Sequence, residues 1–159
     1  MVSPNWPVVD LDPIRRLRVL AATVPGAVHH AEILIPAPLD RVWSVASDLE
    51  NELPELLGTV KSFTITRAEG ERLEAYAVGT LGQRARFDVV LRPGWCLMSS
   101  RFVIGAMAVV QEDGGTRFGS LAGFRLPGGR LLRPAVASLG DRAVRRFAAH
   151  PRLRPDGGA

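Results

Sequence analysis

Cysteine is almost missing from this chain of 159 residues, since Cys96 is the only one. A single cysteine cannot form an internal disulfide and cannot build a zinc cage of thiolates. A chain of this length buries a core without such staples. An unpaired thiol suits a reducing compartment, and no apolar run approaches the roughly 20 residues that span a bilayer. We therefore expect a cytoplasmic protein without a membrane span.

Lysine is equally scarce, because Lys61 stands beside 19 arginines. The formal charge at pH 7 is only +4, although the sequence pI is about 10.5. Residues 125–154 carry eight of the arginines and one acidic residue, Asp141. Arginines can bind nucleic-acid phosphates, but no nucleic-acid-binding motif and no interleaved aromatics accompany them. We interpret them as solvated surface and expect no nucleic-acid partner.

Several signatures of enzyme chemistry are also missing. The sequence has no P-loop, no G-x-G-x-x-G dinucleotide fingerprint and no G-x-S-x-G nucleophile elbow. Its three histidines lack the spacing of zinc ligands. We therefore expect no metal site and no cofactor. The composition, 47% hydrophobic and 23% charged, excludes a disordered chain, a coiled coil and a collagen-like repeat.

The chain does contain a succession of short strands that end at turn residues. Alternating apolar residues predict strands over 28–35, 60–67, 73–81, 84–91, 95–102, 106–111 and 116–124. Helical spacing predicts two short helices over 39–46 and 51–57 and a long helix over about 131–149. This order predicts a curved antiparallel sheet with one long helix laid across it. A single helix can leave part of such a sheet uncovered, which favours a pocket for a small molecule.

Two segments flank this pattern. Asp12-Pro13 predicts a helix start, followed by apolar positions over 14–24. We interpret this helix as a strap across the sheet; a lid, or an arm exchanged within a homodimer, is the alternative. The sequence thus divides into an N-terminal extension (1–27), a ligand-binding domain (28–150) and a flexible tail (151–159).

One motif resembles a known family. The pattern Ile33-x-Ile35-x-Ala37-Pro38-x-x-x-Val42-Trp43-x-x-x-x-Asp48 is similar to the opening signature of the START-related SRPBCC superfamily, which includes polyketide cyclase/dehydrase-like proteins. The turn Asp113-Gly114-Gly115-Thr116-Arg117 resembles the one before that family's last strand. The resemblance covers about residues 28–150. It implies an α+β helix-grip fold, in which a seven-stranded curved antiparallel sheet, two short helices and a long C-terminal helix enclose a cavity. It implies a hydrophobic ligand but no reaction, because members include enzymes, carriers and sensors.

Four residues are candidate catalytic groups. His29 lies in phase with Ile33 and Ile35, which predicts an inward imidazole able to move protons near neutral pH; a histidine half in solvent is the alternative. Tyr76 could orient a ligand carbonyl. Arg86 and Asp88 could polarise a carbonyl and move a proton if they point inward. Strand periodicity favours the other interpretation, in which they form a solvent-facing ladder of charges.

The remaining candidates are expected to contact the ligand. Arg101 lies near a strand end and could anchor a carboxylate or phosphate at the cavity mouth. Methionine and aromatic side chains adapt to varied apolar ligands, but they are equally common in a plain core. The candidate ligand-binding residues are Trp43, Arg84, Trp95, Met98, Arg101, Met107, Phe118, Ser120, Phe124, Val136 and Leu139.

The sequence leaves two functions open. One is a cofactor-independent polyketide cyclase or dehydratase of secondary metabolism, whose cavity folds a flexible substrate and excludes water while acid and base groups assist. The other is a non-catalytic carrier or sensor of a lipid or another apolar ligand. Ionisable groups inside the cavity would favour the enzyme.

Overall fold

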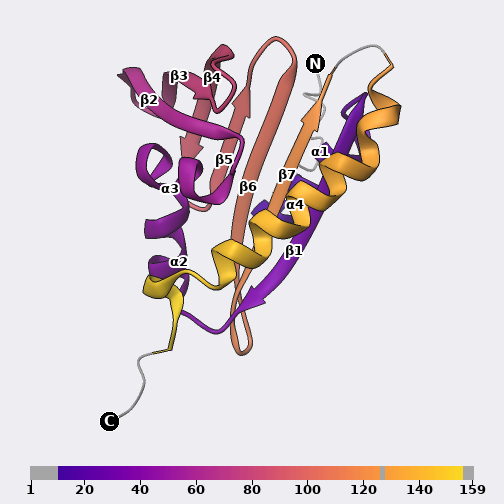
Figure 1. Ribbon diagram of the computed structural model, residues 1–159. Helices are drawn as coiled ribbons and strands as arrows, with labels where there is room; N and C mark the ends of the chain where they lie inside the picture. Colours follow the sequence, from indigo (N-terminus) through magenta and orange to yellow (C-terminus); the bar gives the residue numbers. More distant parts are fainter. Residues whose placement is uncertain (1–10, 126–127, 156–159) are drawn as a thin grey trace, which may run out of the picture.

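A computed structural model describes residues 11–125 and 128–155. Within them, seven strands form one antiparallel sheet in the order β1-β7-β6-β5-β4-β3-β2 (Figure 1). The strands are β1 (Ala27–Ile35), β2 (Val60–Glu69), β3 (Arg72–Gly79), β4 (Arg84–Arg92), β5 (Trp95–Ser99), β6 (Val103–Glu112) and β7 (Gly115–Phe124). Strands β2 to β7 form a meander, and β1 pairs with β7 at the edge. The predicted seven-stranded antiparallel sheet is confirmed.

The helices follow the predicted order. Helices α2 (Leu39–Ala46) and α3 (Leu49–Leu56) connect β1 to β2, and α4 (Arg133–Ala148) follows the 3-10 turn η1 (Gly129–Leu132). Pro134 stands in the first turn of α4, where its missing N–H breaks no helical hydrogen bond. Figure 1 shows α4 lying diagonally across the sheet beside β7 and β1. This arrangement confirms the helix-grip α+β fold.

The turn between β5 and β6 differs from the prediction. Strand β5 ends at Ser99 and β6 begins at Val103, three residues earlier than the predicted start at 106. The backbone N–H of Ser100 donates to the carbonyl of Val103 (2.8 Å), and the Ser100 hydroxyl accepts from the Val103 N–H (3.1 Å). These bonds close a tight turn, so the pairing of Val103 with Phe124 extends the strand.

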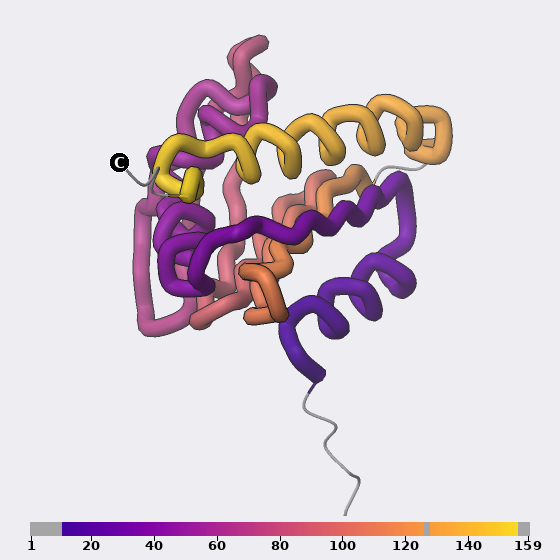
Figure 2. The backbone as a smooth tube through the Cα atoms, turned by 90° about the horizontal axis from the view of Figure 1, so that it is seen from below, coloured from indigo at the N-terminus to yellow at the C-terminus, as the bar shows by residue number. Residues whose placement is uncertain are grey.

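The sheet has two covered faces. Its inner face packs against α2, α3 and α4, and its outer face packs against α1 (Pro13–Thr23). Figure 2 shows α1 and α4 on opposite sides of β1. Each face therefore carries its own apolar core, and the strand period of two decides which core a residue joins.

Helix α1 straps the outer face. The Asp12 carboxylate accepts a hydrogen bond from the N–H of Arg15 (2.9 Å), and Pro13 opens the helix as predicted. Leu17 is fully buried, and a side chain at Gly119 of β7 would come within 2.7 Å of it. This packing agrees with the strap interpretation. The first ten residues of the predicted extension lie outside the described residues.

The inner face is filled at the end of the sheet where β1 leads into α2. The buried Thr116 hydroxyl donates to the carbonyl of Ala37 (2.8 Å), and the rings of Phe118 and Phe147 stack with centroids 4.1 Å apart. Leu153, in the 3-10 turn η2 (Pro151–Leu153), is also buried there. The predicted flexible tail over 151–159 therefore begins with a packed segment, and residues 156–159 lie outside the described residues.

Candidate functional site

The inner face opens towards the other end of the sheet. On β7, Thr116 and Phe118 are buried, whereas Ser120 and Phe124 further along the same face are only half-buried. On β6 the same change separates the buried Met107 from Gly105 and Val103, which precede it on the same face and are half-buried. We call this end, formed by the β3–β4 turn (80–83), the β5–β6 turn (100–102), η1 and the start of α4, the mouth end. Its inward side chains are only partly covered by protein.

One polar pair stands on this face. Nε2 of His29 on β1 lies 2.8 Å from Oδ1 of Asp141 on α4. An ionised carboxylate only accepts, so this bond places the proton on Nε2 and leaves Nδ1 of a neutral ring with its lone pair. The His29 side chain is 25% exposed and that of Asp141 is 53% exposed. This contact places the His29 side chain on the inner face, and its partial exposure also agrees with the alternative of a histidine half in solvent.

Gly140 makes this contact possible. A Cβ atom at Gly140 would come within 2.7 Å of Cδ2 of His29, closer than real Cβ contacts. The glycine lets α4 approach β1, and the next residue, Asp141, then reaches the imidazole. Sequence reasoning missed Asp141 as a site residue, although it is the single acidic residue in the arginine-rich segment.

Ser120 is a second polar group on the same face. It pairs with Ala31 in the β1–β7 register, while His29 pairs with Ala122, so the two polar side chains occupy neighbouring positions of adjacent strands. Gly119 and Leu121, on either side of Ser120, face α1 instead. The inner-face placement of Ser120 follows from this alternation.

Three predicted catalytic residues lie on the outer face. Tyr76 pairs with Arg86, and Glu74 pairs with Asp88, whereas Phe87 between them joins the inner core. Arg84, Arg86 and Asp88 are exposed. The hypothesis that Arg86 and Asp88 point into a cavity is therefore corrected, and the solvent-facing ladder is the observed arrangement. Strands β5, β6 and β7 separate β4 from β1, so the four predicted catalytic residues do not form one site.

Tyr76, Arg86 and Asp88 on the outer face do line a hollow. Two hollows of about 440 and 570 Å³ lie over β2, β3 and β4, and both include Glu74 and Asp88. The larger one is lined by Thr64, Thr66, Glu74, Ala75, Tyr76, Arg86, Phe87 and Asp88. These two hollows do not lie between α4 and the sheet. The expected space beneath α4 is thus partly filled by the Phe118–Phe147 stack.

Trp95 also needs correction as a cavity residue. Its side chain joins the outer core with Leu17, and the guanidinium of Arg16 lies 5.5 Å from its ring centroid. The neighbouring Cys96 faces inward, because a strand alternates sides. Burial raises the pKa of the Cys96 thiol to about 12, so it is no thiolate nucleophile at neutral pH.

The other predicted contact residues fall into two groups. Met98, Met107 and Phe118 are buried in the inner core, and Trp43 on α2 packs against it half-buried. The members nearer the mouth end are Phe124, Val136, Leu139 and Arg101. Val136 is buried, Leu139 is 44% exposed, and Arg101 lies over the ring of Phe102 with its guanidinium 5.1 Å from the centroid.

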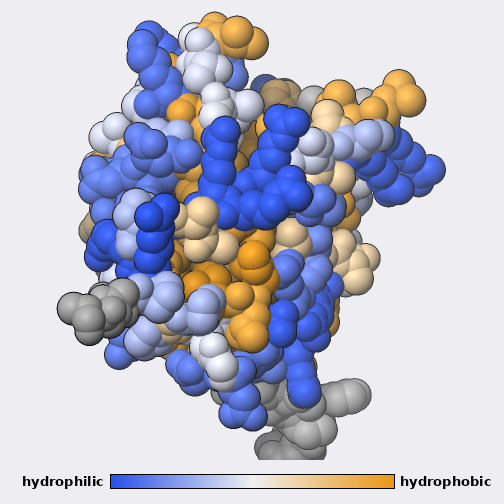
Figure 3. All heavy atoms as spheres, turned by 60° about the horizontal axis from the view of Figure 1, so that its bottom comes forward, coloured by the Kyte–Doolittle hydropathy of each residue, from blue (hydrophilic) through white to orange (hydrophobic). Residues whose placement is uncertain are grey.

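Apolar surface also shows at the opposite end. Figure 3, in which the bottom of Figure 1 comes forward, shows an apolar patch enclosed by hydrophilic side chains. Half-buried apolar side chains from β1 and α2, including Ile33 and Leu39, pack against the inner core near this end. The inner core is therefore not completely covered on this side either.

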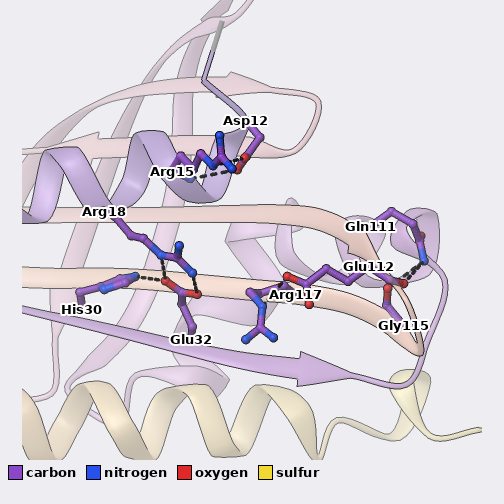
Figure 4. A network of polar contacts seen from close by, with 9 residues as sticks. All are labelled: Asp12, Arg15, Arg18, His30, Glu32, Gln111, Glu112, Gly115 and Arg117. Atoms are coloured by element: carbon purple, nitrogen blue, oxygen red, sulfur yellow. Dashed lines mark hydrogen bonds and ion pairs between the residues drawn. The ribbon is translucent and has the colours of Figure 1, made fainter. Parts of the chain in front are cut away.

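A polar network ties α1 to β1 on the outer face (Figure 4). Arg18 donates two hydrogen bonds to the Glu32 carboxylate, at 2.7 and 2.6 Å, and these lower the pKa of Glu32. Nε2 of His30 lies 2.9 Å from the same carboxylate, but burial lowers the pKa of His30 and favours its neutral form. Among the described residues, no cluster of three or more His, Cys, Asp or Glu side chains could hold a metal ion. This network therefore joins secondary-structure elements and is not a metal centre.

Comparisons with known proteins define the fold. No protein-family profile and no curated protein matches the sequence. The structure is similar to that of TTHA0849 from Thermus thermophilus, with a TM-score of 0.59 and 25% identity over 79% of this chain and 96% of that one. It is also similar to the Zhui aromatase/cyclase from Streptomyces sp. R1128, with a TM-score of 0.61 and 16% identity over 83% of this chain and 99% of that one.

A third similar structure is the di-domain ARO/CYC BexL from the BE-7585A biosynthetic pathway. The TM-score is 0.62 at 17% identity, and 86% of this chain matches 54% of that chain, about half its length. These likenesses show that the chain shares the helix-grip fold of these structures. Among the described residues, no helix is long and apolar enough to cross a membrane.

Proposed function

From the SRPBCC-type helix-grip fold that this chain shares with aromatase/cyclases, we propose that it binds a hydrophobic small molecule between α4 and the inner face of the sheet. We further propose that it acts on this molecule as a polyketide cyclase or dehydratase without a cofactor. The observation that carries the catalytic part is the His29–Asp141 pair, set on a face otherwise dominated by apolar side chains.

The chemistry needs few protein groups. A flexible chain of alternating carbonyls cyclises when a base removes a proton from the carbon between two carbonyls and the resulting enolate attacks another carbonyl of the same chain. A confined apolar space brings the two carbons together, which supplies much of the rate. Nδ1 of His29 would take the proton, and Asp141 would hold the ring in the required tautomer and stabilise the imidazolium.

The same pair suits dehydration of the product. After ring closure, the imidazolium protonates the new alkoxide, which gives a hydroxyl and a neutral ring. The neutral ring can then remove the second proton from the attacking carbon and deliver it to this hydroxyl, which leaves as water while the C=C bond forms, so the histidine ends as it began. Ser120, at the neighbouring strand position, could donate a hydrogen bond to a ligand carbonyl. The half-buried Phe124 and the exposed Leu139 would contact the apolar parts of the ligand.

The test uses the full chain and a synthetic poly-β-ketone thioester. We expect turnover to cyclic, dehydrated product by the wild type and loss of turnover in His29→Ala. Arg86→Ala is the matched control, because Arg86 lies on the exposed outer face, and it should keep full activity. Equal turnover in all three proteins would contradict the role of His29.

The second candidate is a carrier or sensor of an apolar ligand. The inner face is filled at the end where β1 leads into α2, with Phe118 stacked on Phe147. This packing favours the carrier or sensor, because it leaves less room for a folded substrate. Native mass spectrometry of the purified full chain separates the two. A stoichiometric ligand that copurifies and is never converted, together with no effect of His29→Ala, would establish the carrier.

A further inference from the structure

Exposed apolar side chains gather at the mouth end. Seven large hydrophobic residues are exposed in the described part of the chain, and five of them belong to this end: Leu81, Phe102, Leu131, Leu132 and Leu139. Leu81 and Leu131 are almost completely solvent-exposed, at 92% and 90%. Single exposed leucines are ordinary, but a group gathered at one end marks an interaction surface.

The topology brings these residues together. In an antiparallel sheet with β3, β4, β5 and β6 as consecutive neighbours, the β3–β4 and β5–β6 turns lie at the same end. The N–H of Arg125, just after β7, donates to the carbonyl of Phe102 (2.8 Å), and its guanidinium donates to the carbonyl of Ser100 (2.7 Å). Figure 1 shows the β5–β6 turn and the start of α4 both at the upper end.

The charges at this end are predominantly positive, although Asp141 of α4, which is paired with His29, lies close to it. Each apolar tip on a turn has an arginine within three positions, and the arginines of this end are Arg84, Arg101, Arg125, Arg130 and Arg133. The sequence contains no Asp or Glu over 79–87, 99–111 or 114–140. The acidic residues concentrate elsewhere, for example around α2 and α3. The mouth end is therefore both apolar and cationic.

We propose that the mouth end docks on an anionic phospholipid surface. The leucine and phenylalanine tips would enter the headgroup region, while the arginines bind lipid phosphates and keep their charged heads at the interface. Separate apolar tips on three turns fit a deformable surface better than a rigid partner. Nucleic acid would match the charge but gives no role to the exposed leucines.

Docking would place the opening of the inner face against the membrane. If the proposed function holds, an apolar ligand then passes between bilayer and protein without crossing water. The docking surface itself does not rest on that function, because the residues substituted to test it, Leu81, Leu131, Arg130 and Arg133, have no part in the proposed catalysis. A negative result in the docking experiment can therefore be distinguished from a negative result in the turnover experiment.

The experiment is co-sedimentation of the full chain with vesicles of phosphatidylcholine alone or mixed with phosphatidylserine. We expect binding to the mixed vesicles that weakens as salt rises. Leu81→Ser combined with Leu131→Ser should lower the affinity at least roughly tenfold, because the bound protein then buries less apolar side-chain area in the bilayer. The control is Val19→Ser, whose side chain on α1 is 51% exposed, and it should bind as the wild type does.

Charge is tested in the same assay. Arg130→Gln combined with Arg133→Gln should weaken binding roughly tenfold or more, whereas Arg72→Gln, near the β2–β3 turn at the other end, should not. Circular dichroism and thermal melting verify that every variant folds. Absence of binding to the mixed vesicles, or equal binding by the paired variants, would overturn the proposal. So would a wild-type dimer that the leucine pair converts to monomer without any vesicle binding, since the surface would then hold a second copy.

Discussion

His29 and Asp141 share a hydrogen bond of 2.8 Å although 112 positions separate them along the chain. The bond joins β1, near the start of the domain, to α4, near its end. It also fixes the orientation of an imidazole that faces partly covered apolar surface. One contact therefore has both a structural and a proposed chemical role, and substitutions can separate them.

Asp141→Ala removes the acceptor for Nε2–H of His29. We expect a loss of about 1 kcal/mol in the free energy of unfolding, the usual worth of such a bond, measured by urea denaturation. Asp141→Asn keeps an acceptor oxygen, so its stability should lie closer to the wild type. If both substitutions lower turnover while only the alanine lowers stability, Asp141 positions the catalytic ring. Unchanged stability in Asp141→Ala would contradict the contact.

Gly140→Ala tests the close approach of α4 to β1. Alanine favours a helix over glycine by about 1 kcal/mol, yet its Cβ would come within 2.7 Å of His29. We expect overpacking, at about 1–3 kcal/mol, to exceed that gain and lower the denaturation midpoint. Ser138→Ala, at an exposed position of the same helix, is the control and should leave it nearly unchanged. A higher midpoint for Gly140→Ala would show that the helix lies further from the strand.

His30, which belongs to the Arg18–Glu32–His30 network, predicts that the stability of the fold depends on pH. The folded pKa of His30 lies below its ordinary value of 6.5, mainly because burial disfavours the charged ring, and Arg18 and His29 add to this while Glu32 opposes it. The unfolded chain therefore binds the proton first as the pH falls, so His30 costs stability below about pH 6.5. Melting temperatures between pH 7.5 and 5 should fall less in His30→Gln than in the wild type, with the ordinary histidine pKa setting this window. A steeper fall in the variant would reverse the assigned direction.

Leu17→Ala tests whether α1 belongs to the folded unit. Leu17 is fully buried on the outer face, so its truncation should cost about 2–5 kcal/mol of unfolding free energy. Val19→Ala, exposed on the same helix, should cost little. Both are measured by chemical denaturation. If Leu17→Ala were as stable as the wild type, α1 would be a loosely attached extension and not a strap.

The local pattern of the chain was enough to predict most of the fold. Period-two alternation gave the strands, and Asp12-Pro13 and Pro134 marked helix starts because caps and proline act within one turn. The turn at 100–102 was misjudged by a few residues, since the pairing of Val103 with Phe124 comes from a strand far along the sequence. The packed Leu153 was missed for the same reason, because its partners lie on other elements.

The candidate site was predicted only in part. The phase of β1 placed His29 inward, but Trp95 was assigned to the wrong face because an aromatic residue suits either core of a sheet that is covered on both sides. Arg86 and Asp88 alternate with apolar residues, and that alternation alone favoured the surface. Asp141 carried no local signal beyond being a lone acid among arginines.

The sequence by itself determined the elements, their order and the alternation of side chains along each strand, because backbone geometry and side-chain alternation are local properties. The tertiary structure alone decided which residues meet. Gly140 permits α4 to approach β1, which brings Asp141 to His29. The antiparallel order gathers Leu81, Phe102 and Leu131 at one end. The scarcity of lysine and cysteine excluded chemistries, but only the packing of distant segments assembled a candidate site.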